Sequence, residues 1–188
     1  MASDRSVTRI SGGQLRGRSV RSKYESGLRP TPERVRAALF SIVGDVTDSK
    51  VLDLYAGTGI LGMEALSRGA KSAEFVEEHA GRCREIKATL GEMGLDAQGL
   101  VYRSKVETAL RTLKSEYDLV FADPPYDQKP WPWLPDGLQR LGLLAEGALF
   151  IAERRHNTVV AERYGNLGMT TDRRYGDTSI SIYEMEAE

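Results

Sequence analysis

From residue 50 onward, short apolar runs alternate with stretches whose apolar residues recur every three or four positions. The first pattern predicts buried strands and the second predicts amphipathic helices. We therefore expect a doubly wound α/β domain with a mostly parallel, seven-stranded sheet. Its last two strands should form an antiparallel hairpin that turns at Gly176 and Asp177. The expected strands are 51–55, 73–77, 99–103, 118–122, 148–153, 170–175 and 179–185, and the expected helices are 59–68, 80–93, 106–115 and 134–143, with a helical turn near 158–164.

The N-terminal residues follow a different pattern. Residues 7–23 are polar, basic and interrupted by adjacent glycines, which predicts a basic hairpin or two short extended segments. Thr31 followed by Pro32 predicts a helix that begins at Pro32 and is capped by the Thr31 side chain. Apolar residues recur along this helix at helical spacing, so it should pack on the main body. We divide the chain into an N-terminal arm, residues 1–44, and a main domain, residues 45–188.

Charge divides the chain at nearly the same place. The formal net charge is −1, yet residues 1–40 hold nine basic and three acidic side chains, a net charge of +6. The remaining residues hold 17 basic and 24 acidic side chains, a net charge of −7. This asymmetry indicates an arm that binds a polyanion, and a merely solvated basic tail is the alternative.

Composition narrows the class of protein. Of the 188 residues 40% are hydrophobic, which excludes a disordered chain, and no apolar run approaches the ~18 residues of a membrane span. The N-terminus lacks the apolar stretch of a signal peptide, and the single cysteine, Cys83, excludes an intrachain disulfide. We expect a soluble, cytoplasmic monomer.

The turn after the first main-domain strand carries a glycine motif. Gly57, Gly59 and Gly62 have the spacing G-x-G-x-x-G between a strand and a helix, where glycines allow a sharp turn and close approach of a ligand. Glu77 ends the next strand, where a carboxylate can accept the hydroxyls of a ribose. Together they predict an adenosine ligand. A tight turn that binds nothing would need the same glycines.

An ionisable residue in the same strand suggests which adenosine ligand binds. Asp53 lies within an apolar run, and a buried acid is costly unless it is paired. The ammonium and sulfonium groups of S-adenosylmethionine would pair with it, whereas a pyrophosphate would be repelled. The alternative is an acid that is held by loop amides for structural reasons.

The segment DPPY follows the fourth strand of the main domain. Asp123 lies where ligands bind in open α/β sheets, and Pro124 and Pro125 stiffen the loop and remove two backbone donors. The Asp123 carboxylate and the Pro124 carbonyl can accept the two N–H bonds of an exocyclic amine, while Tyr126 offers a ring for stacking on a flipped base. This arrangement suits methyl transfer to an amine. An ordinary Pro-Pro turn is the alternative.

These segments together resemble the RsmD family of bacterial 16S ribosomal RNA guanine-N2 methyltransferases. The resemblance rests on DLYAGTGILGMEALSRGA, the acid of FVEE, DPPY, the arm segments RPT and ERVR…LF, and the late YGDT, and it spans nearly the whole chain. It implies a Rossmann-like S-adenosylmethionine-dependent fold that acts on small-subunit ribosomal RNA, within a ribosomal subunit or an assembly intermediate. The chain departs from the family pattern R-E-x-L-F-N at Ala37 and Ser41.

The resemblance also implies roles for individual residues. Cofactor contacts would come from Asp53, Ala56, Gly57, Gly59, Glu77 and Asp123, and the target guanine would be held by Asp123, Pro124, Pro125 and Tyr126. The family arm assigns RNA contacts or loop ordering to Arg29, Thr31, Arg34 and Arg36, and the basic hairpin adds Arg9, Arg16 and Arg18. Deleting the first 28 residues should then reduce RNA methylation far more than cofactor affinity.

Three other functions fit part of the sequence. DPPY equally permits methylation of adenine N6 in DNA, although no additional DNA-recognition domain is evident. The glycine spacing permits a nicotinamide-dependent oxidoreductase, which leaves Asp53 and DPPY unexplained. An RNA-binding module with a vestigial pocket is the third.

His79 and Cys83 have helical spacing but lack the further ligands of a metal site. Trp131 and Trp133 either flank the entry of the base or anchor a proline-rich loop.

Overall fold

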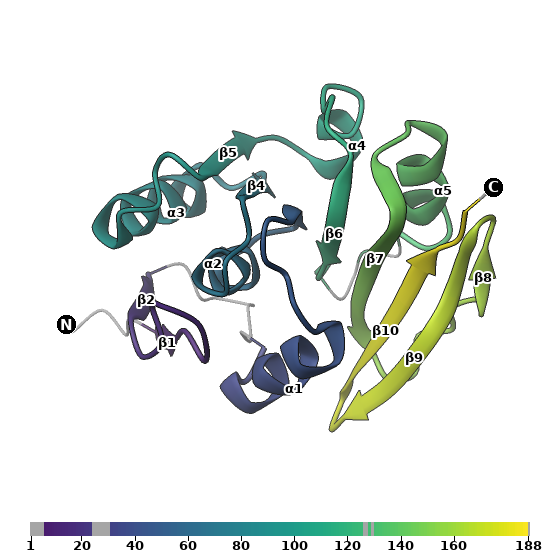
Figure 1. Ribbon diagram of the computed structural model, residues 1–188, viewed down its shortest axis with the longest axis horizontal. Coiled ribbons are helices and arrows are strands. Elements are labelled where there is room, and N and C mark those ends of the chain that lie inside the picture. Colours follow the sequence, from purple (N-terminus) through teal and green to yellow (C-terminus); the bar gives the residue numbers. More distant parts are fainter. Residues whose placement is uncertain (1–5, 24–30, 126–127, 129, 188) are drawn as a thin grey trace.

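The computed structural model describes residues 6–23, 31–125, 128 and 130–187, so Arg29 and Tyr126 lie outside the described residues. The main sheet has the strand order β5-β4-β3-β6-β7-β10-β9-β8, and a separate two-stranded sheet pairs β1 with β2 (Figure 1). The strands are β1 Ser6–Arg9, β2 Ser19–Ser22, β3 Lys50–Leu54, β4 Ser72–Glu77, β5 Gly99–Arg103, β6 Tyr117–Ala122, β7 Leu144–Arg155, β8 Arg163–Tyr164, β9 Leu167–Tyr175 and β10 Thr178–Met185. The helices are α1 Glu33–Val43, α2 Ile60–Ser67, α3 Ala80–Met93, α4 Val106–Ala109 and α5 Trp133–Arg140.

The predicted α/β fold is confirmed. Strands β5, β4, β3, β6 and β7 are parallel, and β10 and β9 add the expected antiparallel hairpin. The main sheet has eight strands rather than seven, because β8 pairs with the start of β9. The helical turn predicted near 158–164 is wrong: Tyr164 pairs with Leu167 at the sheet edge and is buried there.

The two faces of the sheet have separate cores. Apolar residues of α1, α2 and α3 pack with Phe75, Phe121 and Ile151 on one face. Residues of α4 and α5 pack with Leu54 and Phe150 on the other. Helix α4 ends at Ala109, before the predicted end at residue 115. The Arg111 and Thr112 amides bond to carbonyl oxygens three residues earlier, as in tighter turns. No helix among the described residues is long and apolar enough to cross a membrane.

The topology fixes where a ligand can bind. From β3 the chain moves outward in one direction through β4 and β5, and then returns to β6 on the other side of β3 and continues to β7. The strand order therefore reverses between β3 and β6, and open α/β sheets bind ligands at the carboxyl ends of strands at such a point. Asp53 lies near that end of β3, and Asp123 follows β6.

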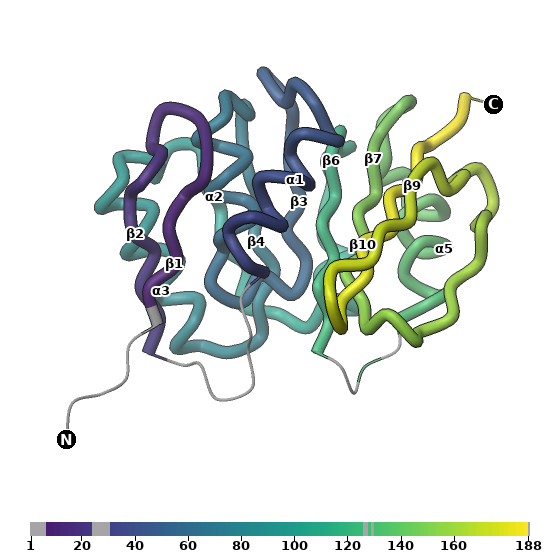
Figure 2. Tube along the Cα trace, turned by 90° about the horizontal axis from the view of Figure 1, so that it is seen from below, coloured from purple at the N-terminus to yellow at the C-terminus, as the bar shows by residue number. Residues whose placement is uncertain are grey.

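The β1–β2 hairpin is built into the main body. Ile10 and Val20 are buried in the same core as α2 and α3, and Figure 2 shows the hairpin lying against these helices. Gly13 has a φ of 75°, and a Cβ there would lie 1.9 Å from the Ser67 carbonyl oxygen. Deleting the first 28 residues would expose this core, so such a deletion would not remove RNA binding alone.

The start of α1 differs from the prediction. Pro32 occupies the cap position, and no side chain caps the helix. The Thr31 hydroxyl instead donates a hydrogen bond of 2.6 Å to the Glu153 carboxylate on β7. The tertiary partner has replaced the local cap, because Thr31 is buried against the carboxyl edge of the sheet.

Candidate active site

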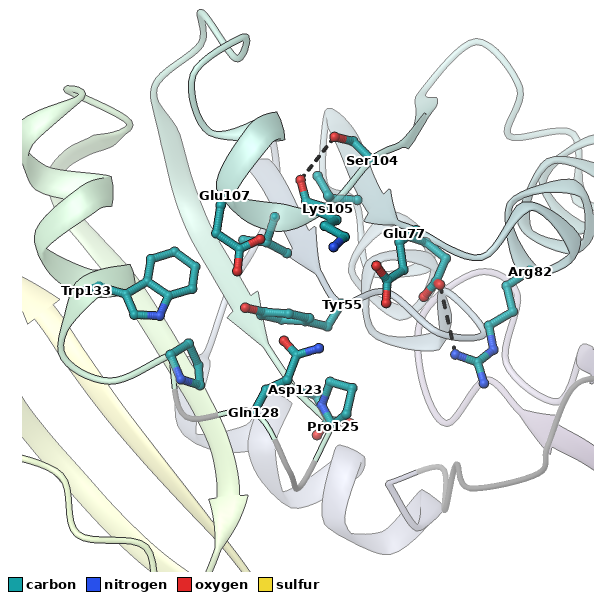
Figure 3. Close-up of a pocket in the computed structure, with 14 residues that line it drawn as sticks. Tyr55, Glu77, Arg82, Ser104, Lys105, Glu107, Asp123, Pro125, Gln128 and Trp133 are labelled. Carbon is teal, nitrogen blue, oxygen red and sulfur yellow. Dashed lines mark hydrogen bonds and ion pairs between the residues drawn. The ribbon is translucent and has the colours of Figure 1, made fainter.

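A cavity of about 350 Å³ opens at the carboxyl edge of the sheet. Its walls come from the ends of neighbouring strands, which the parallel topology brings to one edge. Figure 3 shows Tyr55 near the centre, with Trp133 on one side and Glu77 on the other. The lining residues are Tyr55, Val76, Glu77, Glu78, Arg82, Ser104, Lys105, Val106, Glu107, Asp123, Pro125, Gln128, Pro130 and Trp133.

The glycine motif forms the tight turn between β3 and α2. Gly57 and Gly59 have φ values of 56° and 75°, in the left-handed region that favours glycine. A Cβ at Gly62 would lie 2.4 Å from the Phe75 ring and 3.2 Å from Oδ2 of Asp53. The third glycine therefore allows α2 to pack closely on the sheet. These glycines and Ala56 are not among the cavity lining, so their cofactor role stays a prediction.

Glu77 joins the glycine turn to the cavity. Its Oε2 accepts a hydrogen bond of 2.9 Å from the Gly57 amide, and its Oε1 accepts one of 2.7 Å from the His79 amide. Arg82 lies 3.9 Å from Oε1 as an ion-pair partner. A carboxylate has about four acceptor positions, so Glu77 can hold the turn and still accept ligand hydroxyls.

Asp53 is buried near the carboxyl end of β3 and is not among the residues that line the cavity. The residue is 2% exposed, and its Oδ2 accepts a hydrogen bond of 3.0 Å from the Gly62 amide in α2. Burial raises the pKa of Asp53 to about 7, and this hydrogen bond offsets only part of the effect. The structural alternative, an acid held by an amide, accounts for one carboxylate oxygen. The raised pKa shows that this amide does not fully stabilise the charge.

Asp123 opens into the cavity together with Pro125. Burial of its carboxyl group raises the pKa of Asp123 well above the usual value, and the charges of Glu153 and Asp53 raise it further. Asp123, directly after β6, is thus close enough to Asp53 on β3 and Glu153 on β7 for their charges to affect it. Perturbed carboxyl groups of this kind are typical of functional sites.

Tyr55 was not identified from the sequence. It has a φ of 58°, which is uncommon for an aromatic residue, and within the described part of the chain its buried hydroxyl has no hydrogen-bond partner. An unsatisfied hydroxyl beside a cavity indicates a ligand that would bond to it. Its position directly after an apolar strand, where ligands bind in open α/β sheets, was the sequence signal that could have identified it.

The two tryptophans have different positions. Trp133 lines the cavity and is 37% exposed. Trp131 packs edge-on against Phe150, with ring centroids 6.0 Å apart. Trp131 therefore anchors the loop, as one alternative stated, while Trp133 faces the site.

Two arm residues are buried, which contradicts the predicted RNA contact for them but leaves open the alternative that they order a loop. Arg36 is fully buried and forms an ion pair with Glu64, so it cannot contact RNA directly. Thr31 is 3% exposed and is also excluded from direct RNA contact. Thr31 is held inside by Glu153, and Arg36 by Glu64. The other described candidates are exposed, namely Arg9, Arg16, Arg18 and Arg34.

His79 and Cys83 have structural roles. The His79 side chain caps α3 by accepting a hydrogen bond from the Arg82 amide, and the Cys83 thiol donates to the Glu77 carbonyl oxygen. Both residues therefore fix the segment that carries Glu77.

The chain is similar to known proteins over nearly its whole length. The family model described as "Conserved hypothetical protein 95" matches residues 8–184. The chain belongs to this family, the RsmD family. A relative, "Ribosomal RNA small subunit methyltransferase D" of Escherichia coli strain K12, is 31% identical over 181 residues, which cover 96% of this chain and 91% of that protein. The RsmD-family assignment therefore covers both the arm and the main domain.

Solved structures extend the comparison to the fold. The Escherichia coli protein yhhF has a TM-score of 0.85 and 30% identity, and the match covers 97% of this chain and 100% of that chain. An RNA methyltransferase from Salinibacter ruber, solved in complex with S-adenosyl-L-homocysteine, has a TM-score of 0.62 and 18% identity, with 85% and 95% of the chains covered. The second likeness concerns the fold alone.

Proposed function

We propose that this RsmD-family protein transfers a methyl group from S-adenosylmethionine to the exocyclic N2 amine of a guanine in small-subunit ribosomal RNA. The observation that carries the proposal is the position of Asp123, directly after β6, where the strand order reverses and the cavity opens. The name of the Escherichia coli relative supports ribosomal RNA as the substrate.

The residues at the cavity fit the cofactor. The glycine turn allows close approach to the start of α2, Glu77 would accept the ribose hydroxyls, and Tyr55 lines the cavity beside them. Acidic side chains suit the positive charges of S-adenosylmethionine, which supplies an electrophilic methyl group when bound. The ligand of the Salinibacter ruber protein supports the same choice.

The chain itself would orient the amine. The lone pair of a guanine N2 amine is delocalised into the ring, so acceptors that hold both N–H bonds favour attack on a methyl group. The Asp123 carboxylate and the Pro124 carbonyl would be these acceptors, and Tyr126 would stack on the base. Catalysis then rests on positioning and electrostatics. Because the pKa of Asp123 is raised, its acceptor form should increase with pH.

RNA binding would involve the exposed basic residues of the arm. Arg16 and Arg34 are exposed, and contacts from such residues to phosphates make binding weaker as salt increases. The buried Arg36 and Thr31 would instead hold the arm in place. We infer that the protein acts in the cytoplasm as a monomer.

A direct test uses small ribosomal subunits from cells that lack this protein, incubated with the protein and methyl-labelled S-adenosylmethionine. Mass spectrometry of the digested RNA should find new N2-methylguanine at one position. Absence of transfer would contradict the enzyme assignment, and N6-methyladenine in its place would contradict the guanine assignment. A parallel reaction with DNA tests the adenine-N6 alternative.

A further inference from the structure

A second cavity, of about 180 Å³, lies between the start of α1, the end of β7 and the turn of the β9–β10 hairpin. It is smaller than the roughly 300–1,000 Å³ pockets that enclose drug-sized ligands, which suits a single planar base. Two motifs that the cofactor site leaves unexplained meet here, the arm segment around Arg34 and the late YGDT. The lining residues are Pro32, Arg34, Val35, Glu153, Tyr175, Gly176, Asp177 and Thr178.

Glu153 connects this cavity to the active site. Strands β6 and β7 are parallel, with Phe121 opposite Ile151 and Ala122 opposite Ala152. Continuing this register places Asp123 beside Glu153 at the carboxyl edge. Asp123 lines the first cavity and Glu153 lines the second. The two carboxyl groups therefore stand between the cavities.

The Glu153 carboxyl group lies at the second cavity and is held there by Thr31. The residue is 7% exposed, and its Oε2 accepts the hydrogen bond from Thr31. Burial raises the pKa of Glu153, while Thr31 and the charge of Arg36 offset part of this effect. Among the described residues Thr31 is the hydrogen-bond partner of this carboxyl group, which leaves acceptor positions for a ligand when the group is ionised.

We propose that the second cavity receives the target nucleobase and that Glu153 selects guanine by accepting a hydrogen bond from its N1–H. Guanine presents N1–H next to its N2 amine, so Asp123 can hold the amine while Glu153 accepts the neighbouring N–H. Adenine has an unprotonated ring nitrogen next to its amine, which a carboxylate repels. This inference rests on the proposed function and adds the residue that determines specificity.

The arrangement also assigns a role to Arg34. It is exposed at the rim of the same cavity, on the first turn of α1. A guanidinium there suits the phosphate of the nucleotide whose base enters the cavity. The arm would thus contribute to placing the target nucleotide as well as to general RNA affinity.

The test compares two substrates with two proteins. Reconstituted small subunits carry either guanine or 2-aminopurine at the methylated position, because 2-aminopurine keeps the amine and lacks N1–H. For the wild type, 2-aminopurine should lower kcat/KM by about 10- to 100-fold, the effect of a lost hydrogen bond to a charged group. For Glu153→Met, guanine should lose about the same factor, and the two substrates should then differ less than about 3-fold.

Matched controls distinguish selection of guanine by Glu153 from a purely structural role of this residue. Glu184→Gln changes an exposed acid on β10 and should leave both rates and their ratio unchanged. Thr31→Val removes the donor to Glu153 but keeps the carboxylate, so the wild-type preference for guanine should persist. Cofactor affinity, measured by calorimetry, should stay within 2-fold for all variants. If Glu153→Met does not fold, Glu153→Gln should reduce the preference in the same direction by a smaller factor.

Equal losses on both substrates for Glu153→Met would overturn the proposal, because a structural role does not depend on N1–H. An unchanged preference for guanine in that variant would overturn it as well. Failure of the wild type to methylate the guanine substrate would instead contradict the proposed function itself.

Discussion

Two largely buried clusters of polar side chains differ in how their charge is balanced. The arginine–glutamate cluster consists of Ser11, Arg36, Glu64 and Arg68. Glu64 is fully buried, and it accepts hydrogen bonds from the Ser11 amide, from Nη2 of Arg68 at 2.9 Å and from Nε of Arg36 at 3.4 Å. The Arg36 guanidinium also donates to the carbonyl oxygens of Thr31 and Arg9. This cluster ties the hairpin and α1 to α2.

The acidic cluster consists of Asp53, Asp123 and Glu153. Burial raises the pKa of all three carboxyl groups, and the charge of Arg36 offsets only part of the effect at Glu153. Asp123 and Glu153 open into cavities, whereas Glu64 is enclosed. Paired buried charges here hold the fold together. Acids with few partners among the described residues lie where a ligand can supply a partner.

The largest expected effect is on catalysis. Asp123→Ala should lower kcat by at least about 10³-fold, because the amine loses the acceptor that orients it. Cofactor affinity should change little, as measured by calorimetry. Unchanged transfer would show that the acidic cluster does not act on the substrate.

Asp123→Asn is the matched control for charge, since the amide keeps an acceptor oxygen. It should retain more activity than Asp123→Ala. Its rate should also lack the increase with pH that deprotonation of Asp123 gives the wild type. Rate profiles of the two proteins across pH 5–9 would show the difference.

The next effect is on stability in the arginine–glutamate cluster. Glu64→Ala should lower the free energy of unfolding by about 3–5 kcal/mol, because it leaves Arg36 buried without its anion. Urea denaturation measures this change. Glu146→Ala, at an exposed position on β7, should change stability by less than about 0.5 kcal/mol. Similar losses for both would contradict the structural role of the cluster.

Asp53→Asn should produce a smaller, pH-dependent effect. An acid whose pKa is higher in the folded state binds its proton more tightly there, so it lowers stability as pH rises from about 4 to about 7. The difference between pKa 3.8 and about 7 corresponds to at most about 4 kcal/mol. The variant should therefore lose less stability than the wild type over this range.

Asp123 and Glu153 act in the same direction, so the informative quantity is the difference between wild type and Asp53→Asn. Urea denaturation at pH 4.5 and pH 7.5 measures it. Parallel pH dependence in both proteins would mean that Asp53 does not carry this effect.

The smallest expected effect concerns neither cluster. Arg16→Ala, at an exposed arm position, should weaken binding to small-subunit RNA several-fold. It should also reduce the slope of log affinity against log salt concentration by about 1, the contribution of one phosphate contact. Stability and cofactor affinity should not change. Arg140→Ala on α5 is the matched control on another surface. Equal weakening by both variants would mean that binding responds to net charge rather than to the arm.

Much of the fold could be predicted because its signals are local. Alternation of apolar runs and amphipathic stretches located the five parallel strands, and Gly176 with Asp177 located the terminal hairpin turn. The edge strand β8 has only two residues and carries no periodic pattern, so it was missed. Thr31 was interpreted as a helix cap because sequence neighbours suggest local partners, whereas its partner Glu153 is far away in the chain.

The candidate site was predicted to a similar degree. Glu77 and Asp123 were recognised because each ends a strand near a motif, and both line the cavity. Tyr55 was missed because its left-handed backbone and unsatisfied hydroxyl appear only in three dimensions. The family resemblance placed Arg36 in an arm that contacts RNA or orders a loop, and its burial depends on partners that only the fold brings together, Glu64 and the carbonyl oxygen of Arg9.

The sequence by itself determined the α/β architecture, the glycine turn, the acid at the end of β6 and the family to which the chain belongs. These depend on short-range patterns of hydrophobicity, backbone freedom and motif spacing. Only the tertiary structure decided which charged groups are paired and which carboxyl groups line a cavity, because burial and pairing depend on residues from distant segments. The same arginine or carboxylate holds the fold or faces a ligand according to what packs around it.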